Sequence, residues 1–138
     1  MKIKHTNSPN TEDIYFLRDK IREEIVEYWS TEPFGFFIRN EADEIIAGCH
    51  GNITLGSFTS IHTNQLWVNP NNRKQGLASM LMEKVHEYGR IKECSMATVI
   101  TMSFQSAIKL YKKLGYKIDL ERKDNIHGAS CLFLRKDL

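Results

Sequence analysis

A basic, glycine-containing segment between two apolar runs holds the residues best suited to chemistry in this chain. The apolar run at residues 66–68 stops at Asn69-Pro70, and residues 73–78 then lead into an amphipathic run. The first turn of a helix has backbone N–H groups without intrahelical partners, and the helix dipole favours negative charge there. Gly76 would let a phosphate approach the backbone where a side chain would block it. The pattern therefore predicts a site for a pyrophosphate.

The residues alone leave two other interpretations of this segment open. A plain turn between a strand and a helix would also place Arg73 and Lys74 in solvent. A small nucleic-acid binder would use these two cations together with Lys109, Lys112 and Lys113. A formal net charge of only +2 argues against nucleic acid. The three lysines are also typical of a solvated helix face.

Hydrophobic periodicity predicts the elements that must position this segment. Apolar residues at helical spacing predict helices over residues 13–29, about 76–88 and 103–114, with Gly115 capping the last one. Residues 8–11 can cap the first helix, and residues 30–33 end it. Strands are predicted over residues 3–5, 34–39, 44–53, 59–68, 95–102, 116–121 and 130–135. A turn at residues 40–43 makes a hairpin, and the element order indicates a mixed α/β or α+β domain around one sheet.

The composition is that of an ordinary globular chain. Its 138 residues are 41% hydrophobic and 26% charged, and they most simply form one domain over residues 1–138. No apolar run approaches the roughly 20 residues that span a bilayer, and the polar N-terminus lacks the apolar core of a signal peptide. Cys49, Cys94 and Cys131 are far apart, without metal-ligand spacing. We therefore expect reduced thiols, a cytoplasmic location, and no metal, membrane or nucleic-acid partner.

Two motifs resemble those of a known family. Arg73-Lys74-Gln75-Gly76-Leu77-Ala78 resembles the Q/R-x-x-G-x-G/A acetyl-CoA motif of the GNAT superfamily of N-acetyltransferases. The segment from Ala107 to Tyr116 resembles that family's second signature, A-x-x-L-Y-x-x-x-G-F/Y, in the expected order and separation. One short glycine pattern arises by chance, whereas two motifs on the expected elements are specific. The resemblance extends over the whole chain and implies a mixed, mostly antiparallel central sheet flanked by helices.

The resemblance implies an acetyl-CoA site. In the family, the strand before the loop pairs with the pantetheine arm through its backbone, and the loop holds the pyrophosphate. The implied cofactor-binding residues are Leu66, Trp67, Val68, Arg73, Lys74, Gln75, Gly76, Leu77 and Ala78. Many relatives also have an asparagine three residues before the alanine of the second signature, where this chain has Phe104. Phe104 would pack on the pantetheine arm or fill the core, and Ser103 or Gln105 would supply the missing polar contact.

The resemblance also implies catalytic roles. Tyr111 corresponds to the general acid, since a phenol with a pKa near 10 stays protonated at neutral pH and can donate to a leaving thiolate. From spacing alone, Tyr111 equally suits the apolar face of its helix. The backbone N–H of Val68 would polarise the thioester carbonyl.

Two candidates for the general base are left open, because residues 59–68 contain no Asp or Glu. His62 lies where some relatives carry a glutamate, and an imidazole can accept the ammonium proton directly or through water. His62 also suits an ordinary polar position in an alternating strand. Asn64 and Gln65 would otherwise order a water that relays the proton.

The acceptor is the least specified part of the site. In this fold the acceptor cleft lies among the N-terminal helix, the hairpin turns and the last loop, and the residues there are Glu24, Tyr28, Trp29, Phe58 and His127. Carboxylates would suit a cationic amine, and aromatic rings an apolar one. We expect an N-acetyltransferase, monomeric or homodimeric, that moves an acetyl group from acetyl-CoA to a primary amine of a small molecule or a protein by direct attack in a ternary complex. The alternative is a non-catalytic acyl-CoA-binding sensor, since a strand carboxylate is missing.

Overall fold

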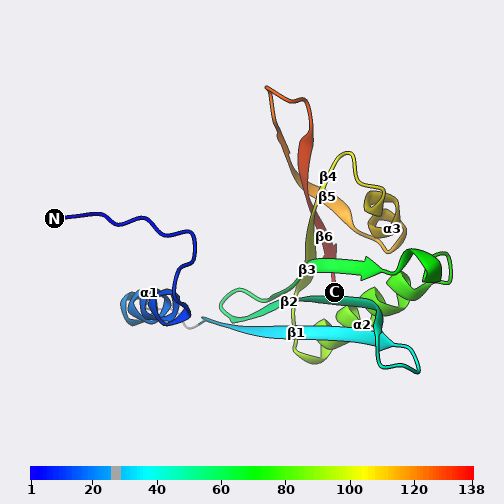
Figure 1. The fold of residues 1–138 in the computed structure, drawn as a ribbon, viewed down its shortest axis with the longest axis horizontal. Helices are drawn as coiled ribbons and strands as arrows, with labels where there is room; N and C mark the ends of the chain where they lie inside the picture. Colours follow the sequence, from blue (N-terminus) through cyan, green and yellow to red (C-terminus); the bar gives the residue numbers. More distant parts are fainter. Residues whose placement is uncertain (26–28) are drawn as a thin grey trace.

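The computed structural model describes residues 1–25 and 29–138. The described residues form one six-stranded sheet, and Figure 1 shows helices beside it. The elements in chain order are α1 (Thr11–Glu24), β1 (Trp29–Arg39), β2 (Ile45–Gly56), β3 (Ser60–Val68), a short 3-10 turn η1 (Pro70–Asn72), α2 (Leu77–Ile91), β4 (Met96–Met102), α3 (Ala107–Lys113), β5 (Lys117–Lys123) and β6 (Ser130–Asp137).

The sheet is mixed and mostly antiparallel. Its strand order is β1-β2-β3-β4-β6-β5, and only β3 and β4 run parallel, because α2 forms the crossover between them. The fold class expected from the sequence, a mixed sheet flanked by helices, is therefore confirmed. Each of the six strands lies where alternation or a buried apolar run predicts one, with ends that differ by a few residues.

Helix α2 forms the core against one face of the sheet. Its inward residues recur at helical spacing, and the fully buried ones are Leu81, Met82, Val85, His86 and Gly89. Gly89 brings the helix close to β3, since a Cβ atom there would lie 2.8 Å from Cγ2 of Ile61. The core continues from Ile61 to Val99 and Leu134 in the middle strands. The sheet and α2 thus form a rigid base for the loop that joins β3 to α2.

The first helix differs from the prediction. It begins at Thr11, where the side chain of Asn10 accepts a hydrogen bond from the Glu12 N–H, and it ends at Glu24. The predicted stop at residues 30–33 lies instead inside β1, where Pro33 is tolerated because β1 is an edge strand. The predicted strand at residues 3–5 is also wrong, since these residues form no strand and are fully exposed.

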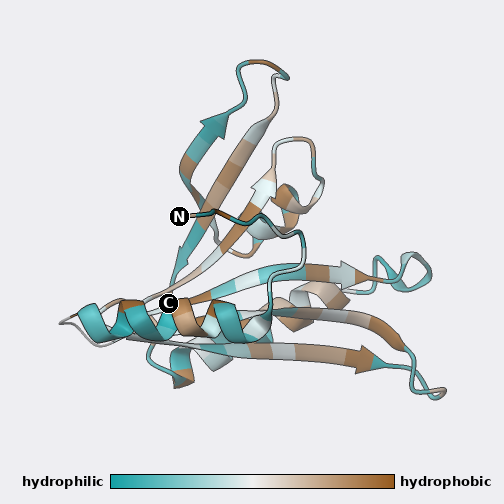
Figure 2. Cartoon of the chain, turned by 60° about the vertical axis from the view of Figure 1, so that its left-hand side comes forward, coloured by the Kyte–Doolittle hydropathy of each residue, from teal (hydrophilic) through white to brown (hydrophobic). Residues whose placement is uncertain are grey.

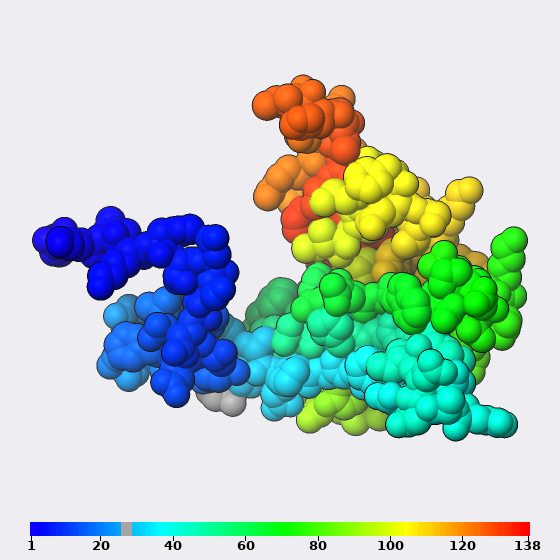
Figure 3. Space-filling view, in the orientation of Figure 1, coloured from blue at the N-terminus to red at the C-terminus, as the bar shows by residue number. Residues whose placement is uncertain are grey.

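Helix α1 stands apart from the sheet, together with residues 1–10 (Figure 1, Figure 3). None of its side chains is buried, and Ile14, Leu17 and Ile21 are 48%, 61% and 54% exposed. In Figure 2, brown hydrophobic patches alternate with teal hydrophilic ones along this helix. No helix in the described part of the chain is long and apolar enough to cross a membrane.

Helix α3 is shorter than predicted and begins at Ala107 rather than Ser103. The residues before it have other hydrogen bonds: the Gln105 N–H donates to the Met102 carbonyl, and Ser103 Oγ accepts from the Ser130 N–H. These bonds tie the segment to β4 and β6 and prevent a further helical turn. Gly115 follows the helix with φ of +96°, as the predicted cap requires.

Candidate active site

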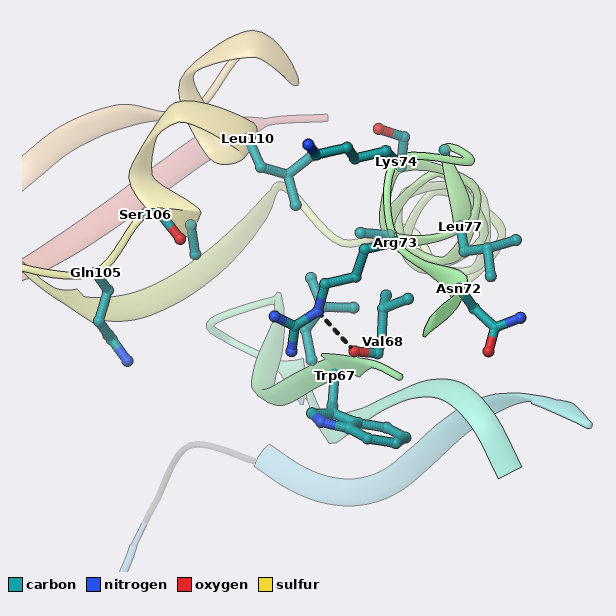
Figure 4. Close-up of a pocket in the computed structure, with 14 residues that line it drawn as sticks. Trp67, Val68, Asn72, Arg73, Lys74, Leu77, Gln105, Ser106 and Leu110 are labelled. Atoms are coloured by element: carbon teal, nitrogen blue, oxygen red, sulfur yellow. Dashed lines mark hydrogen bonds between the residues drawn. The ribbon is translucent and has the colours of Figure 1, made fainter. Parts of the chain in front are cut away.

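A cleft of about 740 Å³ opens between the end of β3, the first turn of α2 and the start of α3. Figure 4 shows the side chains around it, which come from all three elements. The lining residues are Leu66, Trp67, Val68, Asn72, Arg73, Lys74, Gly76, Leu77, Ala78, Ser79, Gln105, Ser106, Ala107 and Leu110. Both motif segments therefore reach the same cavity.

The cleft exists because β3 and β4 part. Their parallel pairing joins only residues 60–63 to residues 96–99, so the second half of β3 has no partner in β4. The register between β2 and β3 also shifts there, because Gly51 pairs with Thr63 while His50 pairs with Gln65, which leaves Asn64 unpaired. Such a bulge bends its strand, and β3 turns away from β4 at this point (Figure 1).

The backbone of β3 presents hydrogen-bonding groups to this gap. The Asn69 N–H donates to the Ile46 carbonyl at 2.8 Å, which makes Ala47 and Val68 a non-hydrogen-bonded pair of the antiparallel ladder. In such a pair the N–H and C=O of both residues point away from the partner strand. The backbone groups of Leu66, two residues earlier, point in the same direction, because the pattern of the ladder repeats every two residues. The N–H groups of Leu66 and Val68 therefore point to the side that β4 has left.

The loop after β3 ends in an uncapped helix N-terminus. Asn69 Oδ1 accepts a hydrogen bond from the Asn71 N–H at 3.0 Å and starts the 3-10 turn. Lys74 and Gly76 then adopt left-handed φ angles of +62° and +79°. Gly76 occupies the N-cap of α2, where no side chain caps the helix, and a Cβ atom built on it would meet no atom within 4 Å. The first-turn N–H groups thus face open space, as an anion site requires.

Two cations flank this helix terminus. The Arg73 Nε donates to the Val68 carbonyl at 3.0 Å, drawn as the dashed line in Figure 4. This bond folds the guanidinium back over the end of β3, so its charge stays at the cleft. The Lys74 side chain lines the opposite side. An anion at the terminus of α2 would therefore meet backbone donors and positive charge together.

On the α3 side of the cleft, Gln105 lines the wall and Phe104 does not. The Gln105 Oε1 accepts hydrogen bonds from Thr101 Oγ1 at 2.8 Å and from the Met102 N–H at 2.9 Å, so this side chain is fixed at the cleft wall. Phe104 is 75% exposed and does not line the described cleft. Of the two roles expected for Phe104, filling the core is therefore wrong. Gln75 is likewise exposed in the loop, outside the cleft lining.

Tyr111 lies one helical turn beyond Ala107, with its side chain 7% exposed. Its ring packs edge-on against Tyr116, with 5.5 Å between ring centroids. Burial raises the pKa of the Tyr111 phenol, and the nearby Cys49 thiol raises it further. Its hydroxyl has no hydrogen-bond partner among the described residues, and Tyr111 does not itself line the cleft. The phenol is therefore protonated and available as a donor at neutral pH.

His62 lies in the paired half of β3. Its Nδ1 lies 2.8 Å from Thr98 Oγ1 in the neighbouring β4. Burial lowers the pKa of the imidazole, so His62 is neutral at pH 7. Side chains alternate along a strand, so His62 points away from the face on which Ile61 meets α2. Tyr111 belongs to the core on the α2 side, so the structure places the two predicted catalytic side chains on different faces of the sheet.

Of the two polar residues predicted to order a water, Asn64 is the unpaired bulge residue and is exposed. The Gln65 side chain lies in hydrogen-bond contact with His50, with Oε1 2.9 Å from Nε2. The Gln65 side chain thus has a hydrogen-bond partner, whereas the Asn64 side chain has none within the described part of the chain.

The predicted acceptor residues do not form one cluster. Trp29 begins β1 and pairs with Gly56 beside the β2–β3 turn that carries Phe58, so these two lie at one end of the sheet. Glu24 is exposed at the end of α1, and Tyr28 lies outside the described residues. His127 lies in the turn between β5 and β6, held by Asp124 at 2.8 Å, at the far edge of the strand order (Figure 1).

Sequence reasoning missed several residues of the cleft. Asn72, Ser79, Ser106, Ala107 and Leu110 line it as well. Ser79 could have been predicted from its place in the first turn of α2, and Leu110 from its place one residue before Tyr111. Asn72 and Ser106 lie in irregular segments, where the direction of a side chain depends on the tertiary fold.

Comparisons with known proteins agree with this geometry. A family model described as an acetyltransferase (GNAT) domain matches residues 32–118. An acetyltransferase from Bacillus cereus has a TM-score of 0.72 at 25% identity, and the match covers 98% of each chain. A candidate acetyltransferase from Agrobacterium tumefaciens gives a TM-score of 0.81 at 21% identity over 100% of both chains. No curated protein sequence matches the chain at a significant level.

A third solved structure of the same fold contains acetyl coenzyme A. A candidate streptothricin acetyltransferase from Bacillus anthracis, in complex with acetyl coenzyme A, has a TM-score of 0.67 at 12% identity, covering 77% of this chain and 62% of that one. At this identity the likeness shows the fold alone. The family match spans both the segment between β3 and α2 and the whole of the second signature. This chain belongs to the GNAT family of acetyltransferases, and it is an acyltransferase that uses acetyl-CoA.

Proposed function

We propose that this acyltransferase moves an acetyl group from acetyl-CoA to a primary amine by direct attack within a ternary complex. The observation that carries the proposal is the continuity of the cleft. Unpaired N–H groups of Leu66 and Val68 lead along the open edge of β3 to the uncapped terminus of α2. A ligand that joins an extended amide-containing arm to a pyrophosphate would match this track of donors.

The residues present fit such a ligand. The first turn of α2 and the cations of Arg73 and Lys74 would hold the phosphates. The edge of β3 would pair with the amide groups of the pantetheine arm, as a further strand would. When bound, acetyl-CoA supplies a thioester carbonyl for the amine to attack and a thiolate that leaves.

The chain's own groups account for the remaining steps. The Val68 N–H points into the gap and would stabilise the developing negative charge on the carbonyl oxygen. A new C–N bond forms while the C–S bond breaks, and the Tyr111 hydroxyl donates its proton to the leaving sulfur. The amine proton passes to neutral His62, through water because His62 lies on the other face of the sheet. Thr98 would hold the ring of His62 during this transfer.

The acceptor class is tested with a panel of amines. Purified protein is incubated with acetyl-CoA and with small primary amines, amino acids, aminoglycosides and lysine peptides, and release of free thiol is measured. We expect one class to release thiol above hydrolysis, with a mass gain of one acetyl group on the amine. Tight acetyl-CoA binding without thiol release for any class would contradict the proposal and favour a non-catalytic sensor.

A further inference from the structure

A buried polar cluster lies behind Tyr111, and the proposed reaction does not use it. It consists of His86 in α2, Tyr116 after α3 and Cys49 in β2, residues that are 4%, 3% and 2% exposed. Burying hydroxyl and imidazole groups costs free energy unless they are hydrogen-bonded. His86 Nε2 and the Tyr116 hydroxyl are hydrogen-bonded to each other at 2.8 Å.

Tyr116 is tied to Tyr111 by two contacts. The Tyr116 N–H donates to the Tyr111 carbonyl at 3.0 Å, just after the left-handed turn at Gly115. The two rings also pack edge to face, with an interplanar angle of 65°. Tyr111 has no hydrogen bond at its own hydroxyl among the described residues, so its ring orientation depends on this packing.

His86 in turn fixes Tyr116 to α2. Their ring centroids lie 5.5 Å apart, in addition to the hydrogen bond. Burial lowers the pKa of His86 to about 4, with the charges of Lys136 and Arg90 acting in the same direction. His86 is therefore neutral at pH 7, and its bond to Tyr116 is a bond between uncharged groups. The contacts form a continuous chain from α2 through Tyr116 to Tyr111.

We propose that the hydrogen-bonded pair of Tyr116 and His86 is the positioning element for Tyr111, holding the phenol in the orientation from which it donates its proton. The same pair couples that orientation to α2, whose first turn forms the anion site. Tyr116 and His86 are thus positioning residues rather than catalytic ones. This inference rests on the proposed acid role of Tyr111.

The first test removes one oxygen atom. Tyr116→Phe keeps the ring but loses the bond to His86, and we expect kcat to fall about three- to tenfold, the size expected for one neutral hydrogen bond. KM for acetyl-CoA should stay within about twofold, because the cleft residues are untouched. Tyr88→Phe is the matched control: Tyr88 lies on α2, as His86 does, but its ring packs on Phe34 and Phe36. Its kcat should equal that of the wild type.

A double variant separates positioning from general stability. In a Tyr111→Phe background, Tyr116→Phe should cause no further loss of kcat, because the hydroxyl that it orients is already absent. An equal loss in both backgrounds would overturn the proposal, as would wild-type kcat in Tyr116→Phe. His86→Gln, which keeps a hydrogen-bonding group, should retain more activity than His86→Leu when both variants are folded.

A spectroscopic measurement tests the positioning without catalysis. With tyrosine labelled by ¹³C at Cζ, the Tyr111 resonance is identified by its loss in Tyr111→Phe. We expect this resonance to move in Tyr116→Phe and to stay unchanged in Tyr88→Phe. If Tyr111→Phe retained full turnover, the acid role would fail, and the resonance would still decide whether Tyr116 orients Tyr111. An unmoved resonance in Tyr116→Phe would refute the positioning role.

Discussion

At the scale of single residues, Tyr111 combines two properties that a proton donor needs. Its hydroxyl is protonated, because burial raises its pKa, and it is not bound to another group among the described residues. Val68 offers the complementary property, a backbone N–H aimed at the gap in the sheet. Neither property can be predicted from the amino-acid sequence alone, since each depends on neighbours that are distant in the sequence.

Tyr111→Phe removes the donor and little else. We expect turnover to fall about tenfold or more, since general acid catalysis contributes at least that much, while affinity for CoA persists. Steady-state kinetics and calorimetric titration with CoA measure the two quantities. The buried ring is retained, so the melting temperature of the variant serves as the control for folding. Turnover equal to the wild type would refute the acid role.

The pKa of His62 predicts a pH dependence. A base must be neutral to accept a proton, and burial lowers the pKa of His62 from its usual 6.5. We therefore expect kcat/KM to be constant from about pH 6.5 up to the alkaline range in which the Tyr111 phenol titrates, and to fall as pH decreases below the lowered pKa of His62. His62→Gln should be slower and should lose this acid limb. An acid limb of the same position in both proteins would transfer the base role to another group, such as a water ordered by Asn64.

The segment of residues 73–78 shows what residue-level reasoning can predict. A basic glycine segment before an amphipathic run predicts the uncapped helix start that the structure shows, because the left-handed angle at Gly76 and the absence of a cap are local features. The direction of the Arg73 side chain is not a local feature. Arg73 donates a hydrogen bond to the Val68 carbonyl, and the path of the loop places these two residues side by side. The exposure of Phe104 depends on how α3 docks, so spacing in the sequence could not predict it.

At the scale of elements, α2 links the donor site to the core. Its N-terminus faces the cleft, and its buried side holds the sheet through Met82 and Val85. Helix α1 has the same kind of apolar periodicity but buries none of its residues. A periodic pattern thus predicts a helix equally well in both cases. It does not say which surface, if any, covers the apolar side.

Gly76→Glu tests the terminus of α2. A side chain at this position meets no atom, so the substitution costs only the left-handed conformation, about 1–2 kcal/mol. The carboxylate would lie at the helix terminus where we propose that the phosphates bind, and we expect CoA binding to be undetectable by calorimetry. Gly76→Asn is the control, because asparagine tolerates this conformation and carries no charge. Affinity like that of the wild type in the glutamate variant would place the phosphates elsewhere.

At the scale of the whole molecule, the cleft results from the sheet rather than from any one element. The strands were predictable, because each has its own alternation or apolar run. Their order, and the early end of the β3–β4 pairing after Thr63, were not. The bulge at Asn64 depends on how β2 pairs with β3, and the gap depends on β4 turning to pair with β6 over its full length. The sequence therefore predicts which segments meet at the site, but not the opening between them.

The buried His86 makes the stability of the whole fold depend on pH. Its pKa is about 4 in the folded state and 6.5 ordinarily, so below pH 6.5 the unfolded chain takes up a proton that the folded chain does not. The free energy of unfolding is therefore unaffected by this group above pH 6.5 and decreases as pH falls toward 4. From this group alone we expect a loss of about 2 kcal/mol between about pH 7 and pH 5, where carboxylates of ordinary pKa remain ionised.

Urea unfolding at these two pH values measures this loss directly. The control is His86→Gln, which keeps a hydrogen-bonding group for Tyr116 but cannot take up a proton. Its free energy of unfolding should be lower than that of the wild type at pH 7, and it should change much less between the two pH values. His62 contributes in the same direction, because burial lowers its pKa as well, so a small residual dependence is expected in the variant. A full loss of about 2 kcal/mol in His86→Gln would show that the proton is taken up elsewhere, and that His86 is solvated rather than buried in the folded protein.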